Sequence, residues 1–422
     1  MGKKSNESGV HPQQPESGVG PQAGSVTRRT VIAGAVAAAG VLALAACAPA
    51  GMNVLPTAAT GGLVRKLKPP RLDTAYLGEE VLCYRPMRRG APNMSIETTG
   101  TQLIAHNYGH GGSGWTLAPG SAAYVNDLLV SSPLAKDLHK ETPVTVIGAG
   151  VIGLFTAYDL VQRGYTDVTI VAERFDNLTS HNAGGLLAPV SMDNDPAMQA
   201  VIEKIGLDAY RFYAEVARGQ HPVFKTGAMI VPSYFDDREE SGLEPYVGKV
   251  MQPAKDVTLD FGTGTTRRMV AYDDGIFIDT AVMMQSLTDW LRPRVTFVKR
   301  KVKRIADLPG HYVVDCAGMG AGALNGDKAM VPVQGHLVML KDQDPAKLKY
   351  MILVYFGDGK TRSGMKVKRS FYQFPKHLLE TAANDVGVVG GTFIEGATFG
   401  TPNEEEFGIL LENARKFYGL KE

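Results

Sequence analysis

A glycine-rich turn after a short apolar run carries the clearest chemistry in this sequence. The segment VTVIGAGVIGL starts with the apolar run Val144–Ile147 and continues with three spaced glycines. Gly148 permits a tight turn, Gly150 lets the backbone approach a pyrophosphate, and Gly153 permits close helix–strand packing. Free N–H groups and the helix dipole favour an anion where the following helix begins. The spacing therefore predicts a dinucleotide-binding turn.

The next residues complete a strand–helix–strand unit. VIGLFTAYDLVQRG has the periodicity of an amphipathic helix that ends at Gly164, and VTIVAE is typical of a second strand. Glu173 closes that strand 20 residues after Gly153, where a carboxylate can accept hydrogen bonds from ribose hydroxyls. A glycine turn without a ligand is the alternative, and the strands, helix and acid together favour the dinucleotide site. Its predicted contacts are Gly148, Ala149, Gly150, Val151, Ile152, Gly153, Glu173 and Arg174.

A second glycine-rich segment, HNYGHGGSGWT, lies upstream of this unit at His106–Thr116. It holds four glycines and two histidines, with no run of apolar side chains. Such a composition indicates a backbone that comes very close to another group, since Cβ atoms would block the approach. A glycine-rich surface loop is the alternative, but such loops rarely combine His, Asn, Tyr and Trp. We expect packing or hydrogen-bonding roles for His106 and His110.

HNYGHGGSGWT is closely similar to a signature of the D-amino-acid oxidase family, which includes D-aspartate oxidase. In that family the loop wraps the flavin ring of FAD and donates backbone hydrogen bonds to it. TSHNAGGLLAP (Thr179–Pro189) and VVDCAG (Val313–Gly318) resemble two further FAD contacts of the family, and Val302 matches a position whose backbone meets the adenine. The resemblance implies FAD contacts at Gly111, Gly112, Ser113, Gly114, Trp115, Thr116, Thr179, Ser180, Gly184, Gly185, Leu186, Val302 and Gly318.

The same resemblance implies the substrate site. Arg85 in CYRPMR matches the family's carboxylate-binding arginine, and Tyr372 in SFYQFP matches its carboxylate-binding tyrosine. The carbonyl of Gly112 would accept a hydrogen bond from the substrate amine. A surface arginine and a half-buried strand tyrosine are the alternatives. Lys368 stands where vertebrate-type members carry a second tyrosine, which leaves the lid and the substrate preference open.

The lid segment GDGKTRSGMKVKRSFYQF is cationic. Alternation along a strand would place Lys368 on the face of Tyr372, where it could hold an acidic substrate side chain. The alternative is that these lysines lie in solvent. KRKVKR (Lys299–Arg304) is interpreted as a solvated strand edge.

The order of these segments differs from the family. There the arginine strand and the glycine loop come last, whereas here they precede the dinucleotide turn. The simplest interpretation is a circular permutation, which compact domains with neighbouring termini tolerate. We therefore expect a permuted segment at residues 72–130, a joining loop at 131–142, and the FAD-binding and substrate-domain remainder at 143–422.

The N-terminal residues have the pattern of an export signal. Arg28 and Arg29 precede an apolar, Ala-rich stretch, which ends at Cys47 in LAAC. Residues 1–47 are interpreted as a twin-arginine signal of lipoprotein type, with Cys47 lipidated, and residues 48–71 as a linker. An uncleaved membrane anchor is the alternative. We expect an exported protein that is lipid-anchored to the bacterial cell envelope, on its periplasmic or extracytoplasmic face.

Composition sets the remaining bounds. The 422 residues carry a formal net charge of +1, which gives no electrostatic reason to expect a nucleic-acid partner. Three cysteines cannot form a disulfide framework, and no His/Cys cluster indicates a metal. We expect Cys83 and Cys316 to be free, buried thiols. Oligomeric state stays open.

The sequence thus predicts an α/β fold, with a FAD-binding βαβ (Rossmann-like) domain and a second, strand-rich substrate domain in permuted order. The resemblance implies an oxidase that converts a D-amino acid and oxygen to a keto acid, ammonia and hydrogen peroxide. Two alternatives stay open: an FAD-dependent dehydrogenase of glycine, sarcosine or a D-amino acid that reduces a membrane quinone, and a non-catalytic FAD-containing lipoprotein.

Overall fold

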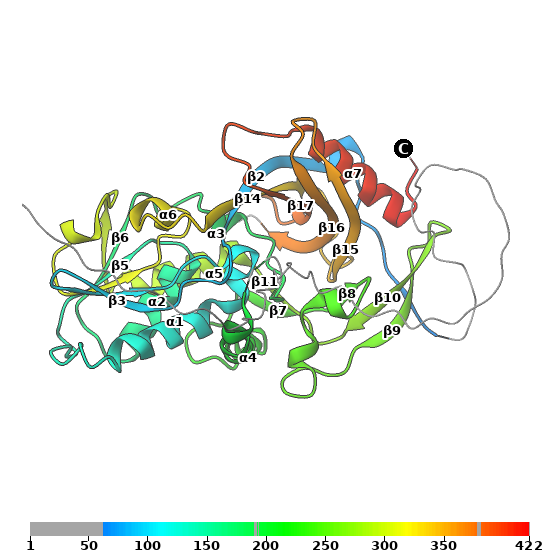
Figure 1. Cartoon of the computed structure of the whole chain (residues 1–422). Coiled ribbons are helices and arrows are strands. Elements are labelled where there is room, and N and C mark those ends of the chain that lie inside the picture. Colours follow the sequence, from blue (N-terminus) through cyan, green and yellow to red (C-terminus); the bar gives the residue numbers. More distant parts are fainter. Residues whose placement is uncertain (1–61, 190–191, 193, 378–380, 422) are drawn as a thin grey trace, which may run out of the picture. The chain divides into compact units, whose positions relative to one another are not determined.

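Two large sheets organise the described part of the chain (Figure 1). The computed structural model describes residues 62–189, 192, 194–377 and 381–421, all within one compact unit. The predicted signal, Cys47 and most of the predicted linker lie outside these residues. None of the described helices is both long and apolar enough to cross a membrane.

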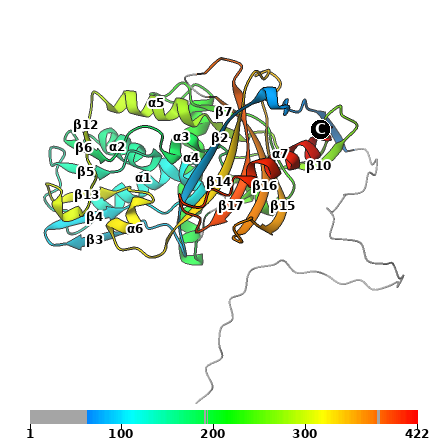
Figure 2. The ribbon, with the colours of Figure 1, turned by 90° about the horizontal axis from the view of Figure 1, so that it is seen from above.

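The first sheet has six strands and contains the dinucleotide turn. Its strands follow one another in space as in Figure 2: β12 (Thr296–Lys299), β6 (Val168–Ala172), β5 (Val144–Ile147), β13 (Tyr312–Asp315), β4 (Gln102–His106) and β3 (Ile96–Thr99). All neighbours are parallel except β3, which runs antiparallel to β4. The predicted strand–helix–strand unit is present as β5, α2 (Val151–Gln162) and β6.

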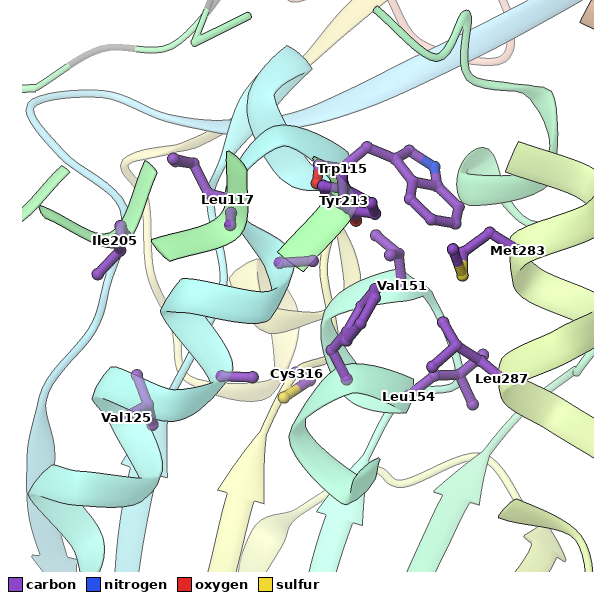
Figure 3. Packing of buried hydrophobic residues seen from close by; sticks show 14 of the residues in the cluster. Trp115, Leu117, Val125, Val151, Leu154, Ile205, Tyr213, Met283, Leu287 and Cys316 are labelled. Carbon is purple, nitrogen blue, oxygen red and sulfur yellow. The ribbon is translucent and has the colours of Figure 1, made fainter. Parts of the chain in front are cut away.

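Helices cover one face of this sheet. They are α1 (Gly114–Val130), α2, α4 (Pro196–Ala217) and α5 (Thr280–Leu291), which pack on one another through apolar side chains (Figure 3). Asp195 and Asp279 cap α4 and α5, since each carboxylate accepts a backbone N–H of the first turn. Ile305 and Leu308 pack on the opposite face of the sheet.

The second sheet has nine strands and forms the strand-rich part. In spatial order they are β1 (Leu63–Lys66), β9 (Lys255–Asp260), β10 (Thr266–Tyr272), β8 (Ser233–Phe235), β15 (Met351–Lys360), β16 (Lys366–His377), β17 (Val386–Glu395), β14 (Met330–Leu340) and β2 (Leu77–Arg88). The C-terminal helix α7 (Glu405–Tyr418) packs on β14, β16 and β17, as Figures 1 and 2 show. A short pair, β7 (Ala228–Ile230) and β11 (Ile276–Ile278), forms a third sheet.

Residues 72–130 contribute to both large sheets. β2 pairs along its length with β14, and β4 pairs with β13. The segment therefore does not fold as a separate module. Arg85 lies on the edge strand β2, and the glycine loop follows β4 and leads into α1.

One sequence interpretation needs correction. Leu63–Lys66, in the predicted linker, forms β1 and pairs in parallel with β9. β7 and β8 are separate strands, because Pro232 between them lacks a backbone N–H and cannot continue a strand. The C-terminal helix α7 begins at Glu405, three residues after Pro402.

Candidate active site

A cavity of about 670 Å³ lies between the dinucleotide turn, the glycine loop and the arginine strand. Most of the residues predicted from the sequence line it: Arg85, Gly111, Gly112, Gly114, Trp115, Gly148, Ala149, Gly150, Val151, Ile152, Glu173, Arg174, Thr179, Ser180, Gly184, Val302, Gly318 and Tyr372. Ser113, Thr116, Gly153, Gly185 and Leu186 are not among the lining residues. The structure thus brings both substrate-binding candidates and most cofactor candidates to one cavity.

The dinucleotide turn is packed too closely for side chains. Gly148 has φ +101°, and a Cβ there would lie 2.4 Å from the Cys316 carbonyl oxygen. A Cβ on Gly153 would lie 2.0 Å from the Gly148 carbonyl oxygen. Gly153 therefore has the packing role that the sequence predicted, and the turn places the N-terminus of α2 at the cavity.

A serine from another segment meets the start of α2. The Val151 N–H donates to Ser180 Oγ at 2.9 Å. Ser180 also accepts a hydrogen bond at its carbonyl oxygen from the Trp115 indole, at 2.9 Å. These contacts join the helix N-terminus, the glycine loop and the short helix α3 (Thr179–Asn182) around one wall of the cavity.

The glycine loop turns sharply from β4 into α1. Gly109 and Gly111 have φ +90° and +57°, which side chains disfavour. The Arg88 N–H donates to the Gly109 carbonyl at 3.1 Å, so the loop lies against the end of β2. The loop therefore presents backbone, and the first turn of α1, to the cavity.

The two histidines of the loop have different environments. His106 Nδ1 lies 3.3 Å from Asp315 Oδ2, and its Nε2 lies 3.2 Å from Glu97 Oε1. Burial opposes the charged form, but these carboxylates outweigh it and raise the pKa of His106. His110 is buried, and burial lowers its pKa to about 4. The predicted packing or hydrogen-bonding roles are confirmed: His106 is hydrogen-bonded and His110 is packed in the interior, where no partner is found for its Nε2 among the described residues.

Arg85 and Tyr372 meet although 287 positions separate them in the sequence. Arg85 Nη1 donates to the Thr392 carbonyl at 3.0 Å, and its guanidinium carbon lies 4.3 Å from the centre of the Phe393 ring. Burial raises the pKa of the Tyr372 hydroxyl, and the neighbouring Arg85 opposes that shift. Among the described residues no carboxylate is paired with Arg85. A cation held in this way can receive an anion from a ligand.

Comparison with known proteins gives the family. The sequence model described as FAD dependent oxidoreductase matches residues 143–421, more than half of the chain. The chain belongs to the FAD dependent oxidoreductase family. The predicted cofactor is confirmed at the level of this family, and so are the α/β fold and the oxidoreductase class.

Individual relatives are more distant. A D-amino-acid oxidase of Streptomyces coelicolor is 29% identical over 211 residues, which are 49% of this chain and 61% of that protein. A D-amino-acid oxidase of Dictyostelium discoideum is 24% identical over 224 residues, or 47% and 56% of the two chains. The chain therefore spans less than two thirds of either relative. The solved glycine oxidase of Bacillus cereus is 19% identical, with a TM-score of 0.47, over 65% of this chain and 79% of that one.

For Lys368 the structure favours the second interpretation, a side chain in solvent. Its side chain is exposed, its ammonium lies 5.3 Å from the centre of the Tyr355 ring, and it does not line the cavity. The register of β16 with β17 shifts between Arg369 and Tyr372. This bulge interrupts the alternation on which the prediction relied, so Lys368 and Tyr372 do not face the same cavity.

Several lining residues were missed from the sequence. Cys83 and Leu337 lie beside Arg85 and Tyr372, and Cys83 is two residues from Arg85 on β2. At the other end, Arg300, Lys301 and Lys303 line the cavity together with Glu173. Lys301 Nζ lies 3.0 Å from Glu173 Oε1. The segment interpreted as a solvated strand edge thus forms one rim of the site, which its charge alone did not indicate. Both predicted free thiols, Cys83 and Cys316, are buried and unpaired.

Proposed function

We propose that this family member is an FAD-dependent oxidase of D-amino acids. The observation that carries the proposal is the Arg85 guanidinium beside Tyr372, in the cavity that the glycine-rich segments line. The balanced reaction joins a D-amino acid, oxygen and water to give a keto acid, ammonia and hydrogen peroxide. The two relatives named D-amino-acid oxidase support this substrate class.

The residues present fit FAD. Gly148 and Gly150 line the cavity and leave no side chain between the N-terminus of α2 and its interior, which suits a pyrophosphate. Glu173 and Val302 line the end that would hold adenosine, while Gly111, Gly112, Gly114 and Trp115 line the end that would hold the flavin ring. When bound, FAD supplies a hydride acceptor.

The protein's own groups would act by positioning. Arg85 would hold the substrate carboxylate through two parallel N–H donors, and the Tyr372 hydroxyl would donate to the same group. The Gly112 carbonyl would accept a hydrogen bond from the amine. With the carboxylate and the amine both held, the configuration of the D-amino acid fixes the direction of the Cα–H bond, and such positioning accounts for much of the rate without a side-chain base.

The competing functions make different predictions. Anaerobic addition of a D-amino acid should bleach the absorbance of bound FAD, and air should restore it with one peroxide per turnover. Bleaching without peroxide, reversed by a soluble quinone, would favour the dehydrogenase alternative. Bleaching by sarcosine or glycine but not by D-alanine would show that those amines, and not D-amino acids, are the substrates. No bleaching by any of these compounds would leave only the non-catalytic alternative.

We further propose that the order of segments arose by circular permutation. The family match begins at residue 143, yet β2 and β4 from the unmatched part pair with β14 and β13. The two ends that a permutation would join are also in contact. Arg415 Nη2 donates to the Leu72 carbonyl at 2.7 Å, and Leu72 is buried in the same apolar cluster as Phe417.

A rearranged chain tests this proposal. Residues 72–130 would follow residue 421 through a short glycine–serine linker, and the new chain would begin at residue 143. We expect it to fold and to bind FAD, because every strand except β9, whose edge partner β1 is left out, keeps its partners. A chain that binds no FAD, and that melts without a cooperative transition, would refute the proposal.

We propose as well that residues 1–47 direct export and that Cys47 receives a lipid. The proposal relies on the paired Arg28 and Arg29, the apolar stretch after them and the LAAC box. In a bacterial host, a radiolabelled fatty acid should be incorporated into the full chain and not into Cys47→Ser. Equal labelling of both would contradict it.

A further inference from the structure

Two glycines in neighbouring strands lie directly beneath the carboxylate-binding pair. Gly335 is on β14 and Gly390 is on β17, each within a paired strand. Neither has positive φ, so the backbone at both positions is one that any residue can adopt. A glycine within a strand costs stability, and it often marks a close approach of another group. These two positions are therefore glycine because a neighbouring group occupies the space that a side chain would need.

Gly335 makes room for the guanidinium of Arg85. A Cβ at Gly335 would lie 2.6, 2.8 and 2.9 Å from Arg85 Nη1, Nη2 and Cζ. All three atoms belong to the planar group, so the guanidinium lies over the glycine. The Thr392 carbonyl and the Phe393 ring hold the same group from β17. Any side chain at Gly335 would displace the arginine from these contacts.

Gly390 does the same for Tyr372. Tyr372 is the cross-strand partner of Gly390, and a Cβ there would lie 2.2 Å from the tyrosine Cε2 and 2.5 Å from its hydroxyl oxygen. The ring therefore lies over the strand instead of standing away from it. It is fixed on its other side by Phe374, whose ring is stacked on it with 4.7 Å between centroids.

We propose that Gly335 and Gly390 are positioning residues for substrate binding, because they form a floor on which Arg85 and Tyr372 lie. This inference rests on the proposed function. Gly391, the next residue, has a different requirement, since its φ of +142° and its closeness to the Ser370 carbonyl concern the backbone itself. The role of Gly390 is thus distinct from that of its neighbour.

The test compares Gly335→Ala and Gly390→Ala with a matched control, Gly359→Ala. A Cβ at Gly359 would lie 2.2 Å from Arg369 Nη1, so the control also sets a methyl group against a guanidinium, but outside the cavity. The probes are D-alanine as substrate and propionate, which has the carboxylate without the amine. Propionate binding is followed by the absorbance change of bound FAD, so one readout does not depend on turnover.

We expect both site variants to retain FAD and to bind propionate at least about tenfold more weakly, since loss of one hydrogen bond to a charged group costs about a factor of ten or more. KM for D-alanine should rise, and Gly359→Ala should change neither value. The decisive measurement is a double-variant cycle. In an Arg85→Ala background, Gly335→Ala should have no further effect, because the guanidinium that the methyl group displaces is gone.

The outcomes separate the two proposals. If Arg85→Ala weakens propionate binding while Gly335→Ala and Gly390→Ala leave it unchanged, the proposed role of the two glycines is overturned and the proposed function stands. If Arg85→Ala itself leaves binding intact, the proposed function fails and the floor with it. If Gly335→Ala alone yields no folded protein, folded protein from the double variant Arg85→Ala/Gly335→Ala supports the proposed contact between Gly335 and the Arg85 guanidinium, and its absence overturns that contact.

Discussion

Replacement of Arg85 by alanine is the most direct test of how this site holds its ligand. Arg85 lies in the cavity, fixed by the Thr392 carbonyl at 3.0 Å and by the Phe393 ring at 4.3 Å. Both of these groups are uncharged, and among the described residues no carboxylate is paired with the Arg85 cation. The substrate carboxylate would supply the missing charge. Arg85→Ala therefore removes the ligand's partner without leaving an unpaired acid behind.

The size of the effect follows from the chemistry of the pair. Loss of one partner from a buried, hydrogen-bonded charge pair costs about 2–5 kcal/mol. At 1.4 kcal/mol for each factor of ten, kcat/KM should fall by roughly 30- to 4,000-fold. KM should carry most of the change, with some loss in kcat because the substrate is also misoriented. The Tyr372 hydroxyl stays in place and can hold the carboxylate only through one neutral donor.

The assay is peroxide release with a D-amino acid, alongside FAD content and propionate binding. Arg85→Lys is the matched control, since it keeps the charge but loses the planar pair of donors. We expect Arg85→Lys to recover part of the propionate binding and little of kcat. FAD content should be unchanged in both variants, as Arg85 lies at the substrate end of the cavity. A purified Arg85→Ala enzyme with near wild-type KM would remove this residue from the site and refute the reasoning.

Three further predictions concern the supporting structure. Gly148→Ala should abolish FAD binding, measured by flavin fluorescence, because a Cβ would lie 2.4 Å from the Cys316 carbonyl; Gly164→Ala, with similarly positive φ but no atom closer than 3.9 Å, should retain it. Burial lowers the pKa of Lys376 from 10.5 to about 8, so between these pH values the unfolded chain binds more protons than the folded one. The free energy of unfolding of the wild type, relative to that of Lys376→Met, should therefore rise by about 3 kcal/mol from pH 8 to pH 10.5. A difference between the two proteins that does not change with pH would contradict this. The raised pKa of His106 means that its stabilisation is complete below about pH 6.5 and is lost as pH rises through the folded-state pKa; chemical unfolding of the wild type and His106→Gln should therefore converge at alkaline pH.

The dinucleotide unit could be predicted from the sequence because its signals are local. Three glycines at fixed spacing, an apolar strand and an amphipathic helix all lie within 30 residues, so each agrees with the next. The structure has the strand at the predicted residues Val144–Ile147 and the helix from Val151. The close packing of Gly153 was also predicted, since only contact with neighbouring backbone explains a third glycine there.

The substrate end was harder to predict, because its geometry depends on distant strands. Arg85 and Tyr372 were named by resemblance, and nothing in their own surroundings in the sequence indicates that they meet. The choice between the two interpretations of Lys368 depended on distant strands as well, because the bulge between Arg369 and Tyr372 exists only in the pairing of β16 with β17. The contribution of Gly335 and Gly390 is likewise visible only when the strands lie side by side.

Strand pairing with distant segments positions Arg85 in this site. β2 carries Arg85, and it is held by β14 from the pair Met330–Arg88 to the pair Leu340–Leu77. That ladder fixes the guanidinium over Gly335, while β17 supplies Thr392 and Phe393 to hold it. None of these contacts comes from a residue next to Arg85 in the sequence. A chain can therefore begin or end beside β2 without changing the substrate end, provided that its strands find the same partners.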